Sequence, residues 1–584
     1  MATLAFAATS ILALQGPVAA DAAITTTPNG NVLTIKGDGA NDLITLSVTG
    51  AQPVIAVNGQ ATTEPAGANT EIVVESGAGI DGVNAGALAA TDYKSLVVDG
   101  GEGNDTLTGG DGADTLNGGE GNDLLNGDAG NDIMVGGKGT DDDSGGAGDD
   151  VMVWNNGDGN DVNEGGAGND ESVFNGAVAA PNNADAITVA PNAGGGTLIH
   201  RTAPTNIEIT VTADTEKVAV NGLAGDDTLA GANGDAGLIA LTLSGGEGND
   251  SLTGGDGADT LNGDAGNDTL TGGKGTDSAN GGAGDDVMVW NNGDGNDRNS
   301  GGEGTDESVF NGAAAAPNNV DAISVAPVAG GGTLIHRIAP TNIEITVTAD
   351  TEKVAVNGLA GDDTLSGSTG LAGHLALTLG GGEGNDMLTG GDGADTLNGD
   401  AGNDTLTGAA GKDGLFAGVG NDQLFARDNQ ADIVSGGADV DSAQTDQRTL
   451  DQISEVENVD ATGDKQAGNG DKVALLPHLG KVRVAGSGKH LVAKIPVACP
   501  TGELNGCSTT LTVETAKGYR RALGTKTVKL GAGAKTTAAI RLSSRAAARA
   551  VRGRLAVRIQ VKTVDAAGNT ASRTVSTTLR VPRR

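Results

Sequence analysis

The sequence predicts an all-β protein, built mainly as a parallel β-solenoid and completed by a C-terminal β-sandwich. Nine-residue units of the form Gly-Gly-x-Gly-x-Asp-x-Leu-x recur in tandem. The 584 residues include 100 Gly but only five Phe, two Trp and two Tyr, so a thin core is expected. Residues 1–471 hold 13 Lys and Arg against 73 Asp and Glu, whereas residues 472–584 hold 22 against 3. An acidic body is therefore joined to a separate basic unit.

The N-terminal stretch Ala2–Leu14 is apolar and is followed by the small residues Val18-Ala19-Ala20. This pattern predicts a signal peptide over residues 1–23 and hence a secreted protein, although an apolar N-terminus without such a role is the alternative. No later run of eighteen apolar residues occurs, so no membrane span is expected.

Three blocks of repeats are in register. Six units run from Gly100 to Val153, five from Gly245 to Val289 and five from Gly381 to Phe425. Position 6 of every unit is Asp, and position 8 is usually Leu, with Asp143 and Ala279 as exceptions. The sixteen position-6 residues are Asp105, Asp114, Asp123, Asp132, Asp141, Asp150, Asp250, Asp259, Asp268, Asp277, Asp286, Asp386, Asp395, Asp404, Asp413 and Asp422.

A longer period of 136 residues overlies the first and nearly repeats Phe174–Asp250 at Phe310–Asp386. Weaker units occur around Asp42, Asp227, Asp363 and Asp441, which indicates one architecture grown by duplication. The predicted organisation is a degenerate β-rich repeat segment (24–99), repeat block 1 (100–173), a linking β segment (174–244), repeat block 2 (245–309), a linking β segment (310–380), repeat block 3 with a closing unit (381–459), a linker (460–471) and a basic β-sandwich domain (472–584).

Each unit has a mechanical interpretation. Gly at positions 1, 2 and 4 permits tight turns, and positions 7 to 9 form a short strand with the position-8 side chain inward. Two units make one coil of about eighteen residues. Stacking brings the position-6 carboxylates of neighbouring coils together, so a cation must lie between them. Carboxylate and carbonyl oxygens form a ligand set that suits Ca²⁺.

The tandem pattern resembles the RTX, or hemolysin-type, calcium-binding repeat of bacterial proteins. The resemblance implies a β-roll in which Ca²⁺ lies between turns two units apart and is bound by both position-6 carboxylates and by turn carbonyls. Asp105 would then pair with Asp123, and Asp114 with Asp132. The three blocks would offer about ten calcium sites.

The C-terminal unit shows period-2 alternation of apolar residues, as at Val557, Ile559 and Val561. About 110 residues of such strands predict an immunoglobulin-like β-sandwich. Cys499 and Cys507 are expected to form a disulfide in an exported protein, and Ser543–Arg552 is expected to form a short helix. The basic charge suits an anionic cell-wall polymer or glycan, or docking on the acidic body; the lack of aromatic residues argues against nucleic acid.

Neither His-Glu-x-x-His nor Gly-x-Ser-x-Gly occurs, so no catalytic residues are assigned. The sequence thus predicts a secreted, non-enzymatic calcium-binding protein with a structural or adhesive role at the cell surface or in the matrix. The alternative is an exported enzyme whose active site lies in the linking β segments 174–244 and 310–380. Outward threonines such as Thr106 and Thr108 leave an ice- or glycan-binding face as a further alternative.

Overall fold

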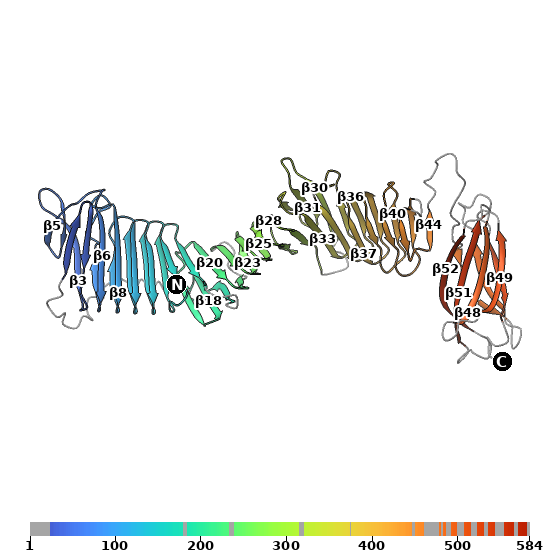
Figure 1. Ribbon diagram of the computed structural model, residues 1–584, viewed down its shortest axis with the longest axis horizontal. Helices are drawn as coiled ribbons and strands as arrows, with labels where there is room; N and C mark the ends of the chain where they lie inside the picture. The colour runs from blue at the N-terminus through green and yellow to red at the C-terminus, as the bar shows by residue number, and fades with distance from the viewer. Residues whose placement is uncertain are drawn as a thin grey trace, which may run out of the picture. The chain divides into compact units, whose positions relative to one another are not determined.

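The computed structural model describes most of the chain (Figure 1). The described residues are 24–178, 184–232, 239–314, 320–373, 375–446, 450–460, 478–479, 483–485, 492–498, 507–515, 522–530, 535–542, 554–565 and 570–580. Within them, every regular element is a β-strand. No helix in these ranges has the length and apolar character needed to cross a membrane. The contacts divide the chain into one unit of residues 1–309 and 343–352 and another of residues 310–342 and 353–584.

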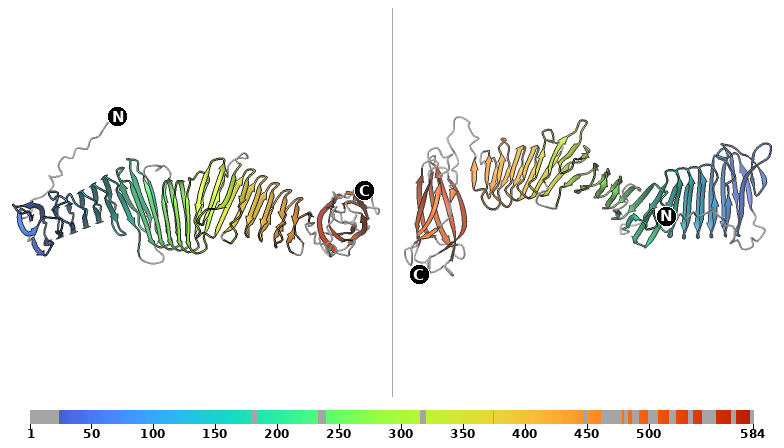
Figure 2. Two further views of the ribbon diagram at one scale, coloured as in Figure 1. Left: turned by 90° about the horizontal axis from the view of Figure 1, so that it is seen from above. Right: turned by 180° about the vertical axis from the view of Figure 1, so that it is seen from behind.

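The first unit is a parallel β-solenoid, seen in Figure 2 as a succession of stacked strands. One sheet contains β1 (Thr25–Asn29), β2 (Val32–Lys36), β6 (Glu71–Ala78), β8 (Ser95–Glu102), β10 (Asp114–Glu120), β12 (Ile133–Lys138), β14 (Val151–Trp154), β16 (Glu171–Asn175), β20 (Lys217–Ala224), β22 (Ala240–Glu247), β24 (Thr260–Ala265), β26 (Ser278–Ala283), β28 (Arg298–Glu303) and β32 (Ile343–Val347). The facing strands are β5 (Gln60–Pro65), β4 (Val54–Val57), β3 (Leu43–Thr49), β7 (Gly82–Asn84), β9 (Thr106–Thr108), β11 (Leu124–Ala129), β13 (Asp142–Ala147), β15 (Val162–Ala167), β19 (Ile207–Val211), β18 (Thr197–Ala203), β17 (Ala186–Pro191), β21 (Thr228–Gly231), β23 (Ser251–Gly257), β25 (Thr269–Gly275) and β27 (Val287–Trp290).

The strand register confirms the eighteen-residue coil. Leu116 of β10 lies opposite Met134 of β12, and Leu107 of β9 lies opposite Leu125 of β11. Successive nine-residue units therefore alternate between the two sheets. The position-8 side chains point between the sheets, where these four residues are fully buried.

The duplicated insertion is a hairpin set into the stack. β17 and β18 pair antiparallel, and so do β18 and β19. β19 then pairs parallel with β15, and β17 pairs parallel with β21, so the parallel stacking resumes beyond the hairpin. The ring of Trp154 stacks on that of Phe174 with centroids 4.1 Å apart, which fills the wider coil beside the insertion.

The second unit begins with the other copy of this hairpin and continues as a parallel solenoid. One sheet contains β31 (Thr333–Ala339), β30 (Ala322–Pro327), β34 (Thr364–Gly367), β36 (Met387–Asp392), β38 (Thr405–Ala410), β40 (Gln423–Ala426), β42 (Ser442–Thr445) and β44 (Asn458–Asp460). The facing sheet contains β33 (Lys353–Ala360), β35 (Ala376–Glu383), β37 (Thr396–Ala401), β39 (Gly414–Phe416), β41 (Ile433–Ser435) and β43 (Gln452–Ser454). The boundary at residue 309 falls within β29 (Glu307–Asn311).

The basic C-terminal segment forms two antiparallel sheets around a shared apolar core. One sheet contains β45 (His478–Leu479), β46 (Arg483–Ala485), β47 (Val492–Ala498) and β50 (Lys535–Arg541), and the other contains β48 (Cys507–Thr515), β49 (Ala522–Leu530), β51 (Arg554–Asp565) and β52 (Thr570–Arg580). Ile495 and Ile540 of the first sheet cluster with Leu511 and Ile559 of the second. The expected signal peptide (1–23), the helix at 543–552 and Cys499 with its disulfide lie outside the described residues.

Candidate metal centre

All sixteen position-6 aspartates lie in the turns between the two sheets, and each is only 1 to 3% exposed. They stack in rows along the edges of the solenoid. The backbone N–H of Asp105 donates to Oδ1 of Asp123 at 2.7 Å, and that of Asp123 donates to Oδ1 of Asp141 at 2.8 Å. Ten contacts of this kind join two of the sixteen aspartates among the described residues. The structure thus brings Asp105 to Asp123 and Asp114 to Asp132, the pairs that the resemblance implies.

The second carboxylate oxygen of these residues faces the turn backbone. Oδ2 of Asp105 and of Asp123 is buried and has no hydrogen-bond partner in the described structure. A Cβ added to Gly100 would meet Asp105 Oδ2 at 2.5 Å and the carbonyl oxygen of Gly118 at 2.6 Å. A carboxylate oxygen and a carbonyl oxygen of the next coil therefore converge on space that only glycine leaves open.

The converging groups are oxygen atoms. Among the described residues, no three His, Cys, Asp or Glu side chains gather closely enough to hold a metal by themselves. A cation in these turns must therefore also use backbone carbonyls. Such a ligand set of carboxylates and carbonyls fits a hard cation such as Ca²⁺.

Electrostatics give the same indication. Burial raises the pKa of Asp105 to about 7, and the nearby charges of Asp81 and Asp123 raise it further against the lowering effect of a backbone hydrogen bond. Burial likewise raises the pKa of Asp132 to about 8, with Asp114 and Asp150 adding to the effect. The ionised rows are thus unfavourable near neutral pH unless a cation compensates them.

Comparison with known families identifies the repeats. The model described as RTX calcium-binding nonapeptide repeat matches residues 97–125, 108–143, 117–152, 242–270, 263–289, 380–415 and 389–424. The chain contains RTX calcium-binding nonapeptide repeats. No curated protein matches the sequence. The matched RTX segments coincide with the three predicted blocks and hold all sixteen aspartates.

Position 5 of the RTX units explains the frequent Asn-Asp pair. The backbone N–H of Asn122 donates to Oδ1 of Asn104, and that of Thr140 donates to Oδ1 of Asn122, both at 3.0 Å. This ladder runs opposite to that of the aspartates, in which the earlier residue donates to the later side chain. Together the two ladders satisfy neighbouring backbone donors in each turn and fix the stacking register.

The aspartate rows extend beyond the RTX matches. The degenerate units predicted from sequence take part: Asp42 N–H donates to Asp81, Asp227 to Asp250, Asp363 to Asp386, and Asp422 to Asp441. The sequence reasoning missed nine further members, which are Asp81, Asp161, Asp170, Asp185, Asp297, Asp306, Asp321, Asp432 and Asp451.

A signal for two of these missed residues is present in the sequence. Residues 165–173 read GGAGNDESV and residues 301–309 read GGEGTDESV, which retain the glycines and the position-6 Asp. Ser172 and Ser308 replace Leu at position 8, and the longer turn after each Trp shifts the units by two residues. The spacing to the preceding Asp is therefore 20 rather than 18 residues, as in the contact from Asp150 to Asp170.

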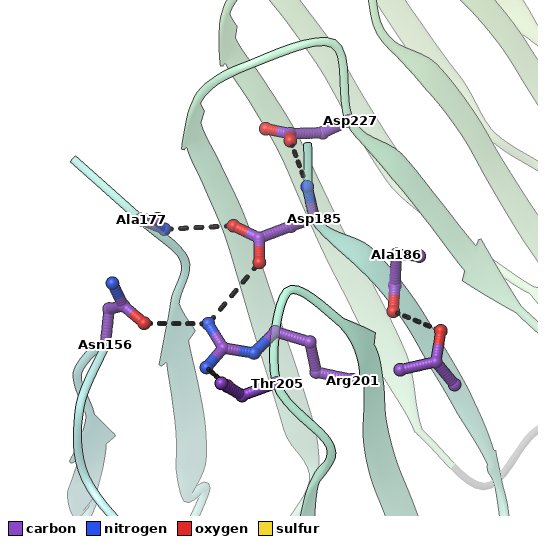
Figure 3. A network of polar contacts seen from close by, with 8 residues as sticks. Asn156, Ala177, Asp185, Ala186, Arg201, Thr205 and Asp227 are labelled. Carbon is purple, nitrogen blue, oxygen red and sulfur yellow. Dashed lines mark hydrogen bonds and ion pairs between the residues drawn. The ribbon is translucent and has the colours of Figure 1, made fainter. Parts of the chain in front are cut away.

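A protein side chain occupies the start of one row (Figure 3). Arg201 is 1% exposed, and its Nη1 lies 3.4 Å from Oδ1 of Asp185 and 2.9 Å from Oδ1 of Asn156. Its Nη2 donates to Thr205 Oγ1 at 2.6 Å, and the guanidinium carbon lies 4.9 Å from the centroid of the Trp154 ring. Arg201 thus places a fixed positive charge between two turns where the hairpin interrupts the regular coil.

Arg337 repeats this arrangement in the second copy, where it is 2% exposed and lies 3.5 Å from Oδ1 of Asp321. Both arginines stand in the motif Thr-Leu-Ile-His-Arg. The histidines of this motif bond to nearby asparagines, as in the 3.0 Å contact of His200 with Asn206. The arginines were not singled out from the sequence; the conserved spacing to the inserted hairpin in both copies was the available signal.

Proposed function

We propose that this is a secreted protein whose RTX repeats fold on Ca²⁺ and that it has a structural or adhesive role at the cell surface or in the matrix. The observation that carries the proposal is the stacking of buried carboxylates whose second oxygens face turn carbonyls. The sixteen position-6 aspartates are the proposed ligands, in about ten sites within the three blocks. Bound Ca²⁺ would supply the positive charge that the rows lack.

The basic C-terminal domain is the proposed contact to a partner. Its strands alternate buried apolar residues with exposed basic ones, as at Lys494 between Ala493 and Ile495 in β47. Exposed Lys526 and Lys529 lie on β49 of the other sheet. We infer an immunoglobulin-like β-sandwich that displays positive charge, which suits an anionic cell-wall polymer or glycan. Its folding is expected to be independent of Ca²⁺.

The enzyme alternative depends on a site in the linking segments. In the described parts of 174–244 and 310–380, the buried arginines pair with buried aspartates rather than pointing toward an open pocket. These pairs explain the buried charges there by packing alone. We therefore retain the non-enzymatic interpretation.

A calcium titration of the full chain tests the function, with circular dichroism as the readout. We expect the β signal to be largely lost in EGTA and to return at submillimolar to millimolar Ca²⁺, the range of extracellular calcium-binding modules. Mg²⁺ serves as the control, because it keeps its water shell and demands near-octahedral geometry. A full β signal in excess EGTA would contradict the proposal.

A further inference from the structure

Three of the aspartate rows end on a glutamate. The backbone N–H of Asp170 donates to Oε2 of Glu216 at 2.9 Å, that of Asp306 donates to Oε2 of Glu352 at 2.9 Å, and that of Asp441 donates to Oε2 of Glu457 at 3.1 Å. In each row the glutamate occupies the place of the next position-6 aspartate. The three glutamates lie 46, 46 and 16 residues after their partners and outside the segments that match the RTX model.

The loops that carry these glutamates reproduce the geometry of an RTX turn. A Cβ added to Gly165 would meet Asp170 Oδ2 and the carbonyl oxygen of Asp214, both at 2.7 Å. A Cβ added to Gly436 would meet Asp441 Oδ2 at 2.6 Å and the carbonyl oxygen of Glu455 at 2.5 Å. The same two kinds of oxygen converge at Gly100 in a regular coil, at 2.5 and 2.6 Å.

The loops achieve this with fewer residues. Their sequences are Asp214-Thr-Glu216, Asp350-Thr-Glu352 and Glu455-Val-Glu457, so each has an acidic residue two positions before the glutamate. In an RTX unit the carbonyl of position 1 precedes the position-6 Asp by five residues. Because Glu has one more methylene than Asp, its carboxylate can reach the row from the shorter loop.

The aspartate at each end has an unsatisfied oxygen. Asp170, Asp306 and Asp441 are fully buried, and Oδ2 of each has no hydrogen-bond partner in the described structure. Glu216 and Glu352 are exposed, so each end is open to solvent through its glutamate. Burial raises the pKa of Asp170 and Asp306, and the charge of the adjacent glutamate adds to the rise. Two carboxylates and a carbonyl thus meet with no positive side chain among their printed contacts.

We propose that Glu216, Glu352 and Glu457 each complete a terminal Ca²⁺ site with Asp170, Asp306 and Asp441, respectively. This inference rests on the proposed function, because it requires that the aspartate rows bind Ca²⁺. It adds calcium ligands from outside the nonapeptide repeats. The glutamate loops are then end sites at which a row keeps its last cation although the repeat pattern has stopped.

The test is the number of calcium ions bound by the full chain, measured by equilibrium dialysis against radioactive Ca²⁺. The variant combines Glu216→Gln, Glu352→Gln and Glu457→Gln. Gln retains an oxygen that can accept the backbone N–H, so the substitution removes the charge and keeps the hydrogen bond at the row end. We expect the triple variant to bind three fewer calcium ions than the unsubstituted chain, and each single variant one fewer.

The matched control combines Glu247→Gln, Glu303→Gln and Glu383→Gln, which are exposed glutamates at position 3 of their turns. It removes the same charge and should bind the full number of calcium ions. Equal stoichiometry of the triple variant and the unsubstituted chain would overturn the terminal sites, as would an equal loss in the control. If the unsubstituted chain bound no calcium, the proposed function itself would fail, which is a different result.

Discussion

Asp143 is a carboxylate in the apolar core, and its replacement by Leu should stabilise the solenoid. It stands at position 8 of its unit, is 2% exposed and lies opposite Leu125 and Asn163 of the neighbouring strands. Its Oδ1 has no hydrogen-bond partner in the described structure. Burial raises the pKa of Asp143 well above its usual range, and the charges of Asp161 and Asp141 add to this effect. The second copy of the repeat carries Ala279 at the same place.

The magnitude follows from these surroundings. A buried Leu side chain contributes about 2 kcal/mol relative to exposure. Removal of a buried polar group without a partner recovers a further ~2 kcal/mol. Asp143→Leu should therefore raise the local free energy of unfolding by about 4 kcal/mol. Ala279→Leu removes no polar group and should gain at most about 2 kcal/mol, less any cost of overpacking.

Native-state hydrogen exchange of β11, β13 and β15 in saturating Ca²⁺ measures this local free energy, and β24, β26 and β28 report on Ala279. A carboxyl group with a raised pKa destabilises the folded state more as the pH rises, so the gain from Asp143→Leu should increase from pH 5 to pH 8. The gain from Ala279→Leu should not depend on pH. A loss of stability in Asp143→Leu, or the same gain at both pH values, would refute the reasoning.

Three further predictions concern the metal sites and the buried arginine. Asp123→Asn should lose two calcium ions, Asp114→Asn one and exposed Asp111→Asn none by equilibrium dialysis, because the first lies inside a row and the second begins one; equal losses at Asp111 and Asp114 would contradict direct ligation. In EGTA, β structure measured by circular dichroism should increase from pH 8 to pH 5, because the raised pKa values make the folded state bind more protons; a decrease would contradict this. Arg201→Met should lower the local stability of β17 and β18 by about 3–5 kcal/mol, since it leaves the buried Asp185 unpaired, whereas unchanged hydrogen exchange there would show that the ion pair is dispensable.

Much of the repeat architecture could be predicted from the sequence. A nine-residue period with one apolar residue per unit fixes an eighteen-residue coil, because alternate units must face each other to bury that residue. Leu116 accordingly lies opposite Met134. The same period places Asp105 beside Asp123. Local chemistry was sufficient here, since every step of the stack repeats the same contacts.

The prediction stopped where the period was broken. Asp170 and Asp306 lie in units shifted by two residues, and Asp185 follows an insertion, so counting along the chain does not align them with their rows. Backbone pairing ignores such counts: β14 and β16 remain in register although their partners are 20 residues apart. The longer turn is accommodated outside the sheet, and the row continues within it.

The sequence by itself determined the coil, its inward residues and the sixteen repeated aspartates, because these depend on contacts between neighbouring copies of one motif. Only the tertiary structure decided how the rows continue and end. Arg201 meets Asp185 across a hairpin, and Glu216 meets Asp170 from 46 residues away. Neither contact has a periodic signal. The physical reason is that strand pairing sets which turns are neighbours in space, and a single side chain that reaches into a turn need not repeat along the chain.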